Sequence, residues 1–537
     1  MPPSSRRVPT LVPASDRRLG KLGTRSIGEE VAGLVGRFYI TTPIFYVNGD
    51  PHLGTAYAVI LADAIARWHR LIGDEVRFVT GTDEHGLKIA QSAEAHGVSP
   101  QAWVDVTSAQ FRRAWDALEV SYDDFIRTTE PRHHRSVQRF LERIHDRGDI
   151  YLGTYEGLYC VRCEAYYQPG ELEPGELCPV HHVACERMRE ENYFFALSRY
   201  QDRLLEHYER HPEAIWPESR RNEVLRFIEG GLTDISITRT SIDWGVRVPW
   251  DSRHVFYVWY DALVNYLTAI GYAEDSAEVA AWWPAAHHLL GKDILRFHAV
   301  WWPAMCLAAG IDPPAQLIVT GWLLNEGEKM SKSLANQIDP LGVQRALSAD
   351  ALRHYLVRSS AIGPDWDVSL EALVALYNAE LANGFGNLVA RVGSLIVQRL
   401  GGHVPDAPAT PPDELAIAET IEAVRAGWER WRPNDAMDAA IGLVHRLNAY
   451  LEATEPWRLA KGSAEAASVL GTAREGARLA SVLLSPAIPD GAERARRALG
   501  FDEAGPLAWQ PGMGGATITK PAPLFPRTDL DAVVGRR

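Results

Sequence analysis

Three scarcities narrow the class of protein that this chain can be. Lysine and arginine together number 55, yet only seven are lysines, which leaves 48 arginines. No apolar run reaches the roughly 18 to 20 residues that a membrane-spanning helix needs, so a membrane protein is not expected. There are five cysteines, four of them between positions 160 and 185, a pattern that excludes a disulfide scaffold and indicates a metal site in the reducing cytoplasm.

The formal net charge of −14 does not indicate a general nucleic-acid binder, although a local basic patch would be enough for one. At 537 residues and 59.6 kDa the chain exceeds what one hydrophobic core usually serves, so two to four domains are expected. The first 37 residues are basic and rich in proline. They fit either a transit peptide or a disordered extension, and the lack of an amphipathic stripe favours the extension.

Hydrophobic patterning predicts a mixed α/β fold. A β-rich run at 38–42, a helix at about 54–71 and a second β run at 75–80 predict a parallel sheet with a crossover helix. Strand–helix alternation resumes after residue 253, so an insertion splits the sheet. After about residue 370 the strand signals stop, and long alanine- and leucine-rich periods predict a helical bundle. We therefore expect a Rossmann-like, doubly wound parallel sheet followed by an all-α domain.

Two short stretches indicate phosphate chemistry. In "DPHLGTAY" a strand gives way to a helix, whose N-terminus offers unpaired N–H groups, while Gly54 permits close approach and His52 can donate to a phosphoryl oxygen. Alone, this pattern favours a helix-capping turn with an incidental histidine. The distant stretch "KMSKS" contains Lys329, Ser331 and Lys332, in a chain that has little lysine. A compact ammonium on a flexible stem follows a moving phosphate better than the rigid fork of arginine.

Together these stretches resemble the two signatures of class I aminoacyl-tRNA synthetases, at 52–55 and 329–333. The second match is complete, but Thr55 stands where the family usually has a second histidine. Its hydroxyl can still donate to phosphate, which favours a harmless change over slower adenylate formation or a divergent copy. Within the class, the chain resembles the methionyl-tRNA synthetases over about 38–499, in stretches such as "FVTGTDEHG", "FYVWYDALVNYL", "HLLGKDILRFHAVWWPA" and "EPWRLAK".

The resemblance implies an apolar, aromatic pocket for methionine. A thioether offers only a weak acceptor, so such a pocket must recognise it by shape and by sulfur–aromatic contact. Asp83 is implied to pair with the substrate ammonium, and Arg239 either touches the substrate or forms a structural ion pair. The implied methionine-binding positions are Ile44, Tyr46, Asp83, Trp259, Leu263, Tyr266, Asp293, Ile294, Phe297 and His298. The implied ATP-binding positions are His52, Gly54, Thr55, Lys329, Ser331 and Lys332.

The implied activity is ATP-dependent ligation of L-methionine to the 3′ end of tRNA(Met) through a methionyl-adenylate, with Mg²⁺ accompanying ATP. The methionine carboxylate attacks the α-phosphorus in line and pyrophosphate leaves. Such a transfer needs positioning and cations on the developing charge rather than covalent work by the protein. The candidate catalytic residues are therefore His52, Lys329 and Lys332.

The cysteine cluster has the spacing of a zinc knuckle. Two Cys-x₂-Cys/His pairs, separated by 14 residues, supply four ligands and so close a tetrahedral site. With no open position the zinc is expected to be structural, which disfavours a zinc hydrolase. The predicted ligands are Cys160, Cys163, Cys178 and His181. His182 is the alternative to His181, while Cys185 and Cys306 are expected to be free thiols.

In the family that the chain resembles, a helical domain reads the CAU anticodon. The matching positions are Asn387 and Arg391, which share a helix face at i, i+4 spacing, and Trp457. An exposed tryptophan can stack on an unstacked base. The expected partners are therefore ATP, L-methionine and tRNA(Met). Many relatives dimerise through an appended C-terminal domain that this chain is too short to hold, so a monomer is expected.

The domains expected on this basis are an N-terminal extension (1–37), the first half of the catalytic domain (38–149), a connective insertion with the zinc knuckle (150–235), the second catalytic half (236–325), the signature loop and stem-contact segment (326–372), the anticodon-binding domain (373–505) and a loose tail (506–537).

Synthetases for isoleucine, valine or leucine would need a larger editing insertion. A tRNA-binding module without catalysis would be expected to lose the lysine signature, and a resistance copy would differ at Leu263 or Thr55.

Overall fold

A parallel β-sheet forms the centre of the N-terminal half in the computed structural model, which describes residues 36–160, 165–167, 170, 172–274, 277–325, 327–329 and 338–534. The strand order is β2-β3-β1-β12-β13-β8, with β4 also pairing with β3, and every ladder among them is parallel. The strands are β1 (Arg37–Thr41), β2 (Phe45–Tyr46), β3 (Glu75–Asp83), β4 (Asp124–Arg127), β8 (Ile215–Trp216), β12 (Ala286–Gly291) and β13 (Gln316–Thr320).

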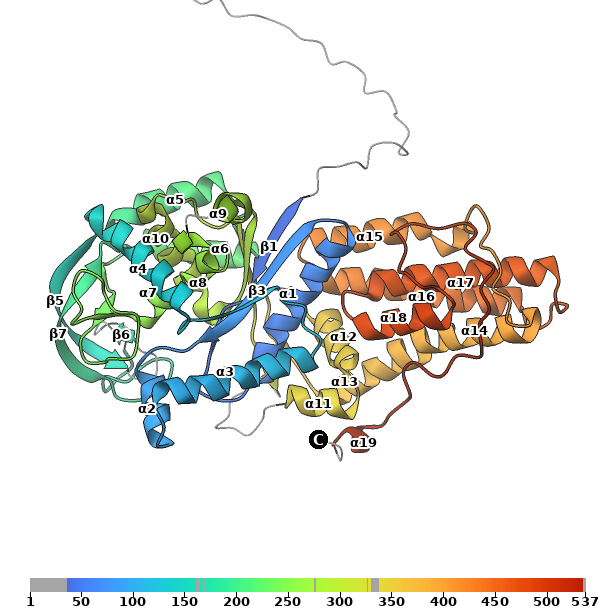
Figure 1. Ribbon diagram of the computed structural model, residues 1–537, viewed down its shortest axis with the longest axis horizontal. Helices are drawn as coiled ribbons and strands as arrows, with labels where there is room; N and C mark the ends of the chain where they lie inside the picture. The colour runs from blue at the N-terminus through green and yellow to red at the C-terminus, as the bar shows by residue number, and fades with distance from the viewer. Residues whose placement is uncertain are drawn as a thin grey trace, which may run out of the picture.

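Successive side chains of the central strands enter two different cores. Ile40 and Phe78 belong to one apolar cluster, whereas their neighbours Tyr39 and Val79 belong to the other. This alternation follows from the two-residue period of a strand, and apolar residues on both faces are typical of a parallel sheet covered on both sides. Strands β1 and β3 accordingly lie between two layers of helices (Figure 1).

The first cluster is covered by α1 (Leu53–Leu71) and α3 (Pro100–Ala117), the second by α4 (Pro131–Asp146) and α10 (Trp302–Ala309) among others. The predicted α/β architecture and the crossover helix at about 54–71 are therefore confirmed. The remaining helices of this half are α2 (Leu87–Ala95), α5 (Gln201–Arg210), α6 (Glu218–Glu229), α7 (Val258–Ala262), α8 (Asn265–Thr268) and α9 (Ala277–Trp282).

An antiparallel sheet lies between the two halves of the parallel one in sequence. Its order is β6-β5-β7-β9, with β5 (Ile150–Cys160), β6 (Ala165–Tyr167), β7 (Glu186–Phe195) and β9 (Ile235–Ser236). Strand β8 also falls within the expected insertion, 150–235, yet it returns to the central sheet beside β13. The insertion thus contributes an edge strand to the central sheet, and its boundaries stay a prediction. A short pair, β10 (Thr238–Arg239) and β11 (Val255–Phe256), follows.

A three-stranded sheet leads into the lysine signature. Its strands are β14 (Leu323–Asn325), β15 (Glu328–Lys329) and β16 (Trp366–Asp367). The turn between β14 and β15 is closed by Gly327, which has a φ of 78° and whose N–H donates to Asp367 Oδ1 at 2.8 Å. Positive φ favours glycine, so Gly327 shapes the hairpin that begins the signature. Ser331 and Lys332 lie outside the described residues.

The C-terminal half is a helical bundle, as predicted (Figure 1). Its helices are α11 (Pro340–Ala346), α12 (Ala349–Ser359), α13 (Leu370–Leu376), α14 (Asn387–Leu400), α15 (Ile417–Glu429), α16 (Pro433–Thr454), α17 (Ala464–Leu484), α18 (Pro489–Ala498) and α19 (Leu530–Val534). One apolar cluster runs from α1 through α12 into α16 and α17, so the sheet and the bundle share a core. None of the helices in the described part of the chain combines the length and apolarity that crossing a bilayer requires.

The segment after α18, expected to be loose, is packed along the bundle. Phe525 and Val533 are buried, and the hydroxyl of Tyr377 donates to Pro526 O at 2.8 Å. Val533 and Leu530 of α19 meet Ala346 of α11. Its many prolines and glycines misled the prediction, because scattered apolar side chains with no regular period still bury against a preformed bundle.

Candidate active site

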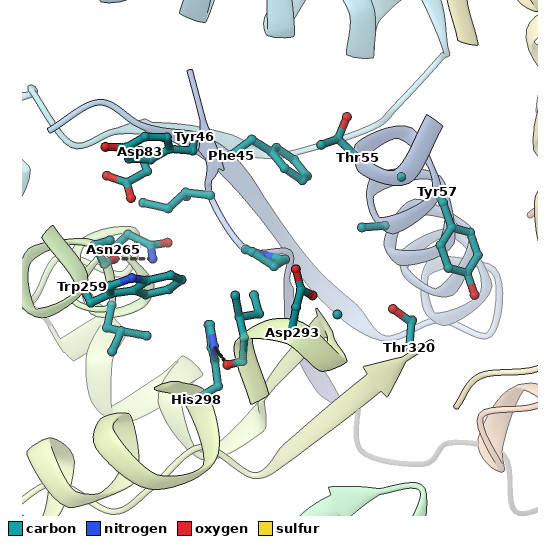
Figure 2. A pocket seen from close by; sticks show the side chains of 18 of the residues that line it. Phe45, Tyr46, Thr55, Tyr57, Asp83, Trp259, Asn265, Asp293, His298 and Thr320 are labelled. Atoms are coloured by element: carbon teal, nitrogen blue, oxygen red, sulfur yellow. Dashed lines mark hydrogen bonds between the residues drawn. The ribbon is translucent and has the colours of Figure 1, made fainter. Parts of the chain in front are cut away.

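A cavity of 420 Å³ opens where the strand order of the sheet reverses. It lies at the carboxyl ends of β1, β3, β12 and β13, near Tyr46, Asp83, Gly291 and Thr320. In open α/β sheets, ligands bind at this topological switch point. The volume is within the range typical of small-molecule sites. Figure 2 shows Tyr46 and Asp83 from the first half of the sheet facing Trp259 and His298 from the second.

His52 caps the N-terminus of α1 at one end of the cavity. Its Nδ1 accepts from the N–H of Gly54 at 3.1 Å, so the neutral ring carries its proton on Nε2. A Cβ on Gly54 would lie 3.1 Å from His52 Cε1, closer than most real contacts, which is why glycine follows the histidine at this spacing. The sequence therefore folds the imidazole back over the first turn of the helix.

Thr55 completes a capping box with His52. Its hydroxyl donates to His52 O at 2.7 Å and accepts from His52 N–H at 3.0 Å. From the sequence we had expected the Thr55 hydroxyl to donate to a phosphate. A hydroxyl has only one proton, and here that proton is donated to His52 O, so it is not available for a phosphate. In the structure Thr55 acts on the backbone of the residue before α1, and lines the same cavity.

An aromatic wall borders the opposite side. Trp259 stacks on Phe297, with centroids 3.9 Å apart and planes 9° apart. Tyr266 O–H donates to His298 Nε2 at 2.7 Å, while His298 Nδ1–H donates to Ile294 O at 3.0 Å. Burial lowers the pKa of His298 to about 4, so the ring is neutral. The wall is therefore uncharged, which suits an apolar substrate side chain.

Phe297 and His298 are presented by a short π-helical segment, Phe297–Trp301, that leads into α10. Such segments are rare and occur frequently at functional sites, because the wider turn redirects side chains. A second π-helical segment, Tyr377–Gly386, immediately precedes Asn387 in α14. The first segment contains two positions that the sequence indicated as functional and the second leads into another, and neither segment could be predicted from a 3.6-residue period.

The structure brings together most of the expected positions. Nine of the ten methionine positions line the cavity: Ile44, Tyr46, Asp83, Trp259, Leu263, Tyr266, Asp293, Ile294 and His298. The tenth, Phe297, lies behind Trp259. Of the ATP positions, His52, Gly54 and Thr55 line the same cavity. Lys329 is described in its backbone only, and Ser331 and Lys332 fall outside the described residues.

Two further lysines, which the sequence reasoning missed, lie at the cavity. Lys88 of α2 lines it, and its Nζ is 5.9 Å from the centroid of the Tyr46 ring. Lys292 stands over the ring of Trp322, another lining residue, at 3.9 Å, and forms an ion pair with Asp365 at 2.7 Å. Because the chain has only seven lysines, considering each of them as a candidate phosphate-binding residue would have identified both Lys88 and Lys292.

Three polar residues of the stretches that carry the resemblance make contacts inside the fold and do not line the cavity. Arg239 does not line the cavity; it is buried, donates to Thr238 O at 2.7 Å and stands over the ring of Tyr257 at 4.4 Å. Its contacts shown here are therefore with the fold rather than with the cavity. Glu84 and His85 are likewise held inside the fold, where they bind Arg127 and Asp261.

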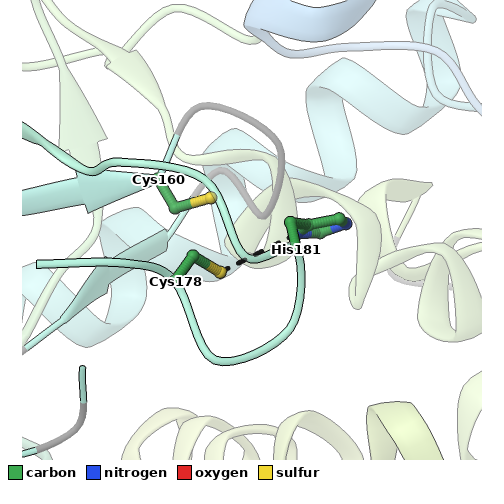
Figure 3. A group of neighbouring side chains, drawn as sticks. All are labelled: Cys160, Cys178 and His181. Carbon is green, nitrogen blue, oxygen red and sulfur yellow. Dashed lines mark hydrogen bonds between the residues drawn. The ribbon is translucent and has the colours of Figure 1, made fainter. Parts of the chain in front are cut away.

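A cluster of metal-ligating side chains lies on the antiparallel sheet (Figure 3). Donor atoms of Cys160, Cys178 and His181 lie within 4.8 Å of one another. His182 instead has a φ of 52° and its Nδ1 forms a 2.7 Å ion pair with Glu173, which raises its pKa. The structure thus directs His181, rather than His182, toward the two sulfurs. Cys163 lies outside the described residues.

The three expected anticodon positions lie on α14 and in the segment after α16. Asn387 and Arg391 lie one turn apart on α14, and the guanidinium of Arg391 stands 5.7 Å from the centroid of the Trp457 ring. Arg391 also donates to Glu452 Oε1 at 2.7 Å. Asn387 is exposed and Trp457 is half-buried, so both present a surface to solvent.

Comparison with known proteins agrees with this geometry. The chain matches the family described as tRNA synthetases class I (M), over residues 38–187 and 170–393. It is 45% identical to methionine--tRNA ligase of Streptomyces coelicolor over 92% of this chain and 97% of that protein. It is 43% identical to the enzyme of Rhizobium meliloti, over 91% and 98% respectively.

Among solved structures, methionyl-tRNA synthetase of Mycobacterium tuberculosis in complex with methionyl-adenylate superposes with a TM-score of 0.87 at 40% identity, covering 92% of this chain and all of that one. The free form of the same protein gives a TM-score of 0.81 at 36% identity, covering 92% and 99%. A family match over more than half of the sequence, joined to full-length relatives of this similarity, shows that the chain belongs to the class I methionine--tRNA ligases.

Proposed function

We propose that this chain activates L-methionine with ATP and transfers it to tRNA(Met). The observation that carries the proposal is the cavity at the switch point of the sheet, which combines a capped helix N-terminus with an uncharged aromatic wall. One end suits phosphate and the other a thioether. Membership of the family supports the same reaction.

The aromatic wall would hold the methionine side chain. Trp259 and Tyr266 line the cavity on the side of His298, and the neutral imidazole keeps a positive charge away from the thioether. Sulfur makes favourable contacts with aromatic edges, and a buried hydroxyl–imidazole pair fixes the shape of the wall. The carboxylate of Asp83, which is almost fully buried at the same cavity, suits the substrate ammonium.

The triphosphate of ATP would meet the N-terminus of α1. Nε2–H of His52 donates to a phosphoryl oxygen in this arrangement, because Nδ1 is engaged by Gly54. The partial positive charge of a 19-residue helix adds to the attraction. Lys329, the last residue of β15, and Lys332 of the same signature are assigned to the leaving pyrophosphate from the sequence.

Catalysis in this proposal rests on placement. The methionine carboxylate attacks the α-phosphorus, pyrophosphate leaves, and a ribose hydroxyl of the tRNA terminus then attacks the mixed anhydride. His52 and the lysines stabilise charge that develops on the phosphates, with Mg²⁺ as the counter-ion of ATP. Lys88, beside Tyr46 and Asp83 at the cavity, adds a further cation that suits the adenylate.

The cysteine cluster fits a structural zinc ion. Two sulfurs and one imidazole nitrogen within 4.8 Å of one another match the spacing of donors around a tetrahedral zinc. Cys160, Cys178 and His181 would hold the ion, with Cys163 as the fourth ligand from the sequence. Bound zinc would tie β5 to the loop before β7, and no step of the reaction passes through it.

The bundle would bind the anticodon of tRNA(Met). Trp457 offers a ring on which a splayed base can stack, and Arg391 and Asn387 offer donors beside it. The i, i+4 spacing on α14 lets both side chains reach one base edge. A tRNA bound here and at the cavity would span the two halves of the molecule.

Methionine-dependent ATP–pyrophosphate exchange tests the proposal. We expect exchange with methionine, no exchange with leucine, isoleucine or cysteine, and a collapse in Lys332→Ala and His52→Ala. Aminoacylation of tRNA(Met) transcripts then tests the second step, with Trp457→Ala reducing charging but not exchange. No exchange with any of the four amino acids would overturn the enzyme assignment and leave a tRNA-binding module as the alternative.

A further inference from the structure

Cys185 is the residue before β7, next to the end of the ladder that β7 forms with β5. The ladder between β5 and β7 pairs Tyr159 with Glu186, and continuing it by one residue on each strand pairs Cys160 with Cys185. Cβ atoms of directly opposed residues lie about 4.5–5.5 Å apart. The two thiols are therefore cross-strand neighbours.

The loop before β7 turns Cys185 toward the same face as Cys178. An isolated bridge pairs Leu177 with Ala184, and the N–H of Cys185 donates to Glu176 O at 3.0 Å. The N–H of Cys178 donates to Val183 O at 2.8 Å on the other side of that bridge. Successive side chains of an extended strand point to opposite faces. Cys178 follows Leu177 and Cys185 follows Ala184, so both cysteines point away from the face of the Leu177–Ala184 pair and share the other face.

Burial agrees with this placement. Cys160 and Cys178 are fully buried and Cys185 is 8% exposed, and all three belong to one small apolar cluster with Leu158. That cluster is separate from the two main cores of the protein. Cys306, by contrast, lies in the second main core on α10. Cys185 is therefore the extra thiol of the knuckle, whereas Cys306 belongs to ordinary packing.

We propose that Cys185 is a reserve ligand of the zinc knuckle, able to replace one of the ligands when that ligand is lost. This rests on the proposed zinc site. Donor atoms of Cys160, Cys178 and His181 lie within 4.8 Å of one another, and Cys185 is buried in the same small cluster as the two cysteines. On exchange, the thiol of Cys185 loses its proton to solvent and its sulfur bonds to zinc, so four ligands are kept.

The exchange is chemically favourable because thiolate is among the strongest protein ligands for zinc. Replacing a cysteine by Cys185 preserves the charge of the site, and replacing His181 adds one negative charge. In both cases the ladder of β5 and β7, continued by one residue, keeps Cys185 next to Cys160. A knuckle without a reserve ligand would instead keep only three protein ligands when one was removed, and would bind its metal more weakly.

Metal content of the full-length protein tests the proposal, with Cys163→Ser, Cys185→Ser and the double variant purified in parallel. Zinc is measured by elemental analysis, and Co²⁺-substituted samples are compared by their thiolate-to-metal charge-transfer absorption. We expect about one zinc per chain in the wild type and in each single variant. The double variant is expected to lose the metal, and Cys163→Ser with Cys306→Ser to keep it. Circular dichroism of each variant reports folding.

Loss of zinc from Cys163→Ser alone, or retention in the double variant, would overturn the reserve role. A wild-type protein that binds neither zinc nor cobalt would overturn the zinc site itself, so the two failures are distinguishable. His181→Ala supplies an independent arm. If Cys185 acts as the reserve ligand, the His181→Ala variant should still bind cobalt. Its charge-transfer band should be stronger than that of the wild type, because a fourth thiolate replaces the imidazole. An unchanged or absent band in that variant would contradict the exchange.

Discussion

Replacement of Arg353 by methionine should weaken the joint between the catalytic sheet and the bundle. Arg353, on α12, is completely buried and donates to Asp63 Oδ2 of α1 at 2.6 Å. It also donates to Leu118 O at 3.2 Å, beside α3, and to Pro486 O at 3.0 Å and Ala487 O at 3.2 Å, before α18. One guanidinium thus connects four segments from both halves.

The loss can be estimated from those contacts. Removing one partner of a buried ion pair costs about 3–5 kcal/mol, because the remaining charge stays in a poorly solvated site. Asp63 keeps Arg67 Nε at 2.7 Å and both donors of Ser121, at 2.6 and 2.7 Å, which favours the lower end of that range. Three carbonyls lose a donor at the same time. At about 2 °C per kcal/mol, the midpoint of thermal unfolding should fall by roughly 6 to 10 °C.

Two assays distinguish an arginine that fixes the orientation of the two halves from one that only stabilises the fold. In Arg353→Met, aminoacylation of tRNA should fall more than ATP–pyrophosphate exchange, since only charging needs the cavity and the bundle in one orientation. Arg474→Met is the matched control, because Arg474 is also buried and donates to Leu499 O at 2.7 Å and Met513 O at 2.8 Å, both outside the catalytic half. Equal losses of exchange and charging in Arg353→Met, or a shift below about 2 °C, would refute the reasoning.

Three further substitutions have defined outcomes. Burial raises the pKa of Asp350 to about 7, so between pH 4 and 7 the folded state keeps a proton that the unfolded state releases, and stability falls as the pH rises. Asp350→Asn should therefore increase the free energy of unfolding at pH 8, by at most about 4 kcal/mol, and leave it unchanged at pH 4, as chemical unfolding at the two pH values measures. Tyr266→Phe leaves His298 Nε2 without its donor and should raise the KM for methionine roughly tenfold, with kcat of exchange nearly constant. Thr55→Val removes both capping bonds to His52 and should lower kcat of exchange about fivefold, whereas Thr55→Ser should restore it; equal kcat in the two variants would contradict the positioning role.

The hydrophobic pattern of the sequence was sufficient to predict those strands and helices whose limits are set by their own residues. The strand at 37–41, the helix at 53–71 and the strand at 75–83 were predicted nearly at their observed limits, because apolar period and the His52 turn are local signals. The methionine positions were found through resemblance rather than period. Taken singly, Trp259 or Tyr266 is indistinguishable from a core aromatic until the sheet brings β1 and β12 together.

The parts that could not be predicted depend on contacts distant in sequence. Strand β8 has two residues, Ile215–Trp216, and is a strand only because β13 lies beside it. The segment around Phe525 packs only because the bundle offers a surface, and Thr55 was assigned to phosphate because its bonds to the His52 backbone are not visible in the sequence. Local propensity carries no information on such pairings.

The unequal use of lysine and arginine follows from what the two side chains do here. Arg353 and Arg474 each bind three or more acceptors that are fixed in the core, a task that suits a rigid planar fork with five donors. Lys88 instead lines the cavity, Lys292 stands over the ring of the lining residue Trp322, and Lys329 begins the signature. A single flexible ammonium can follow a phosphate whose position changes as pyrophosphate leaves, whereas a guanidinium held by several bonds cannot. Exchange of Lys292 for arginine should therefore preserve the ion pair with Asp365 and stability, while the same exchange at Lys332 should abolish pyrophosphate exchange; equal activity of the two variants would show that charge alone suffices.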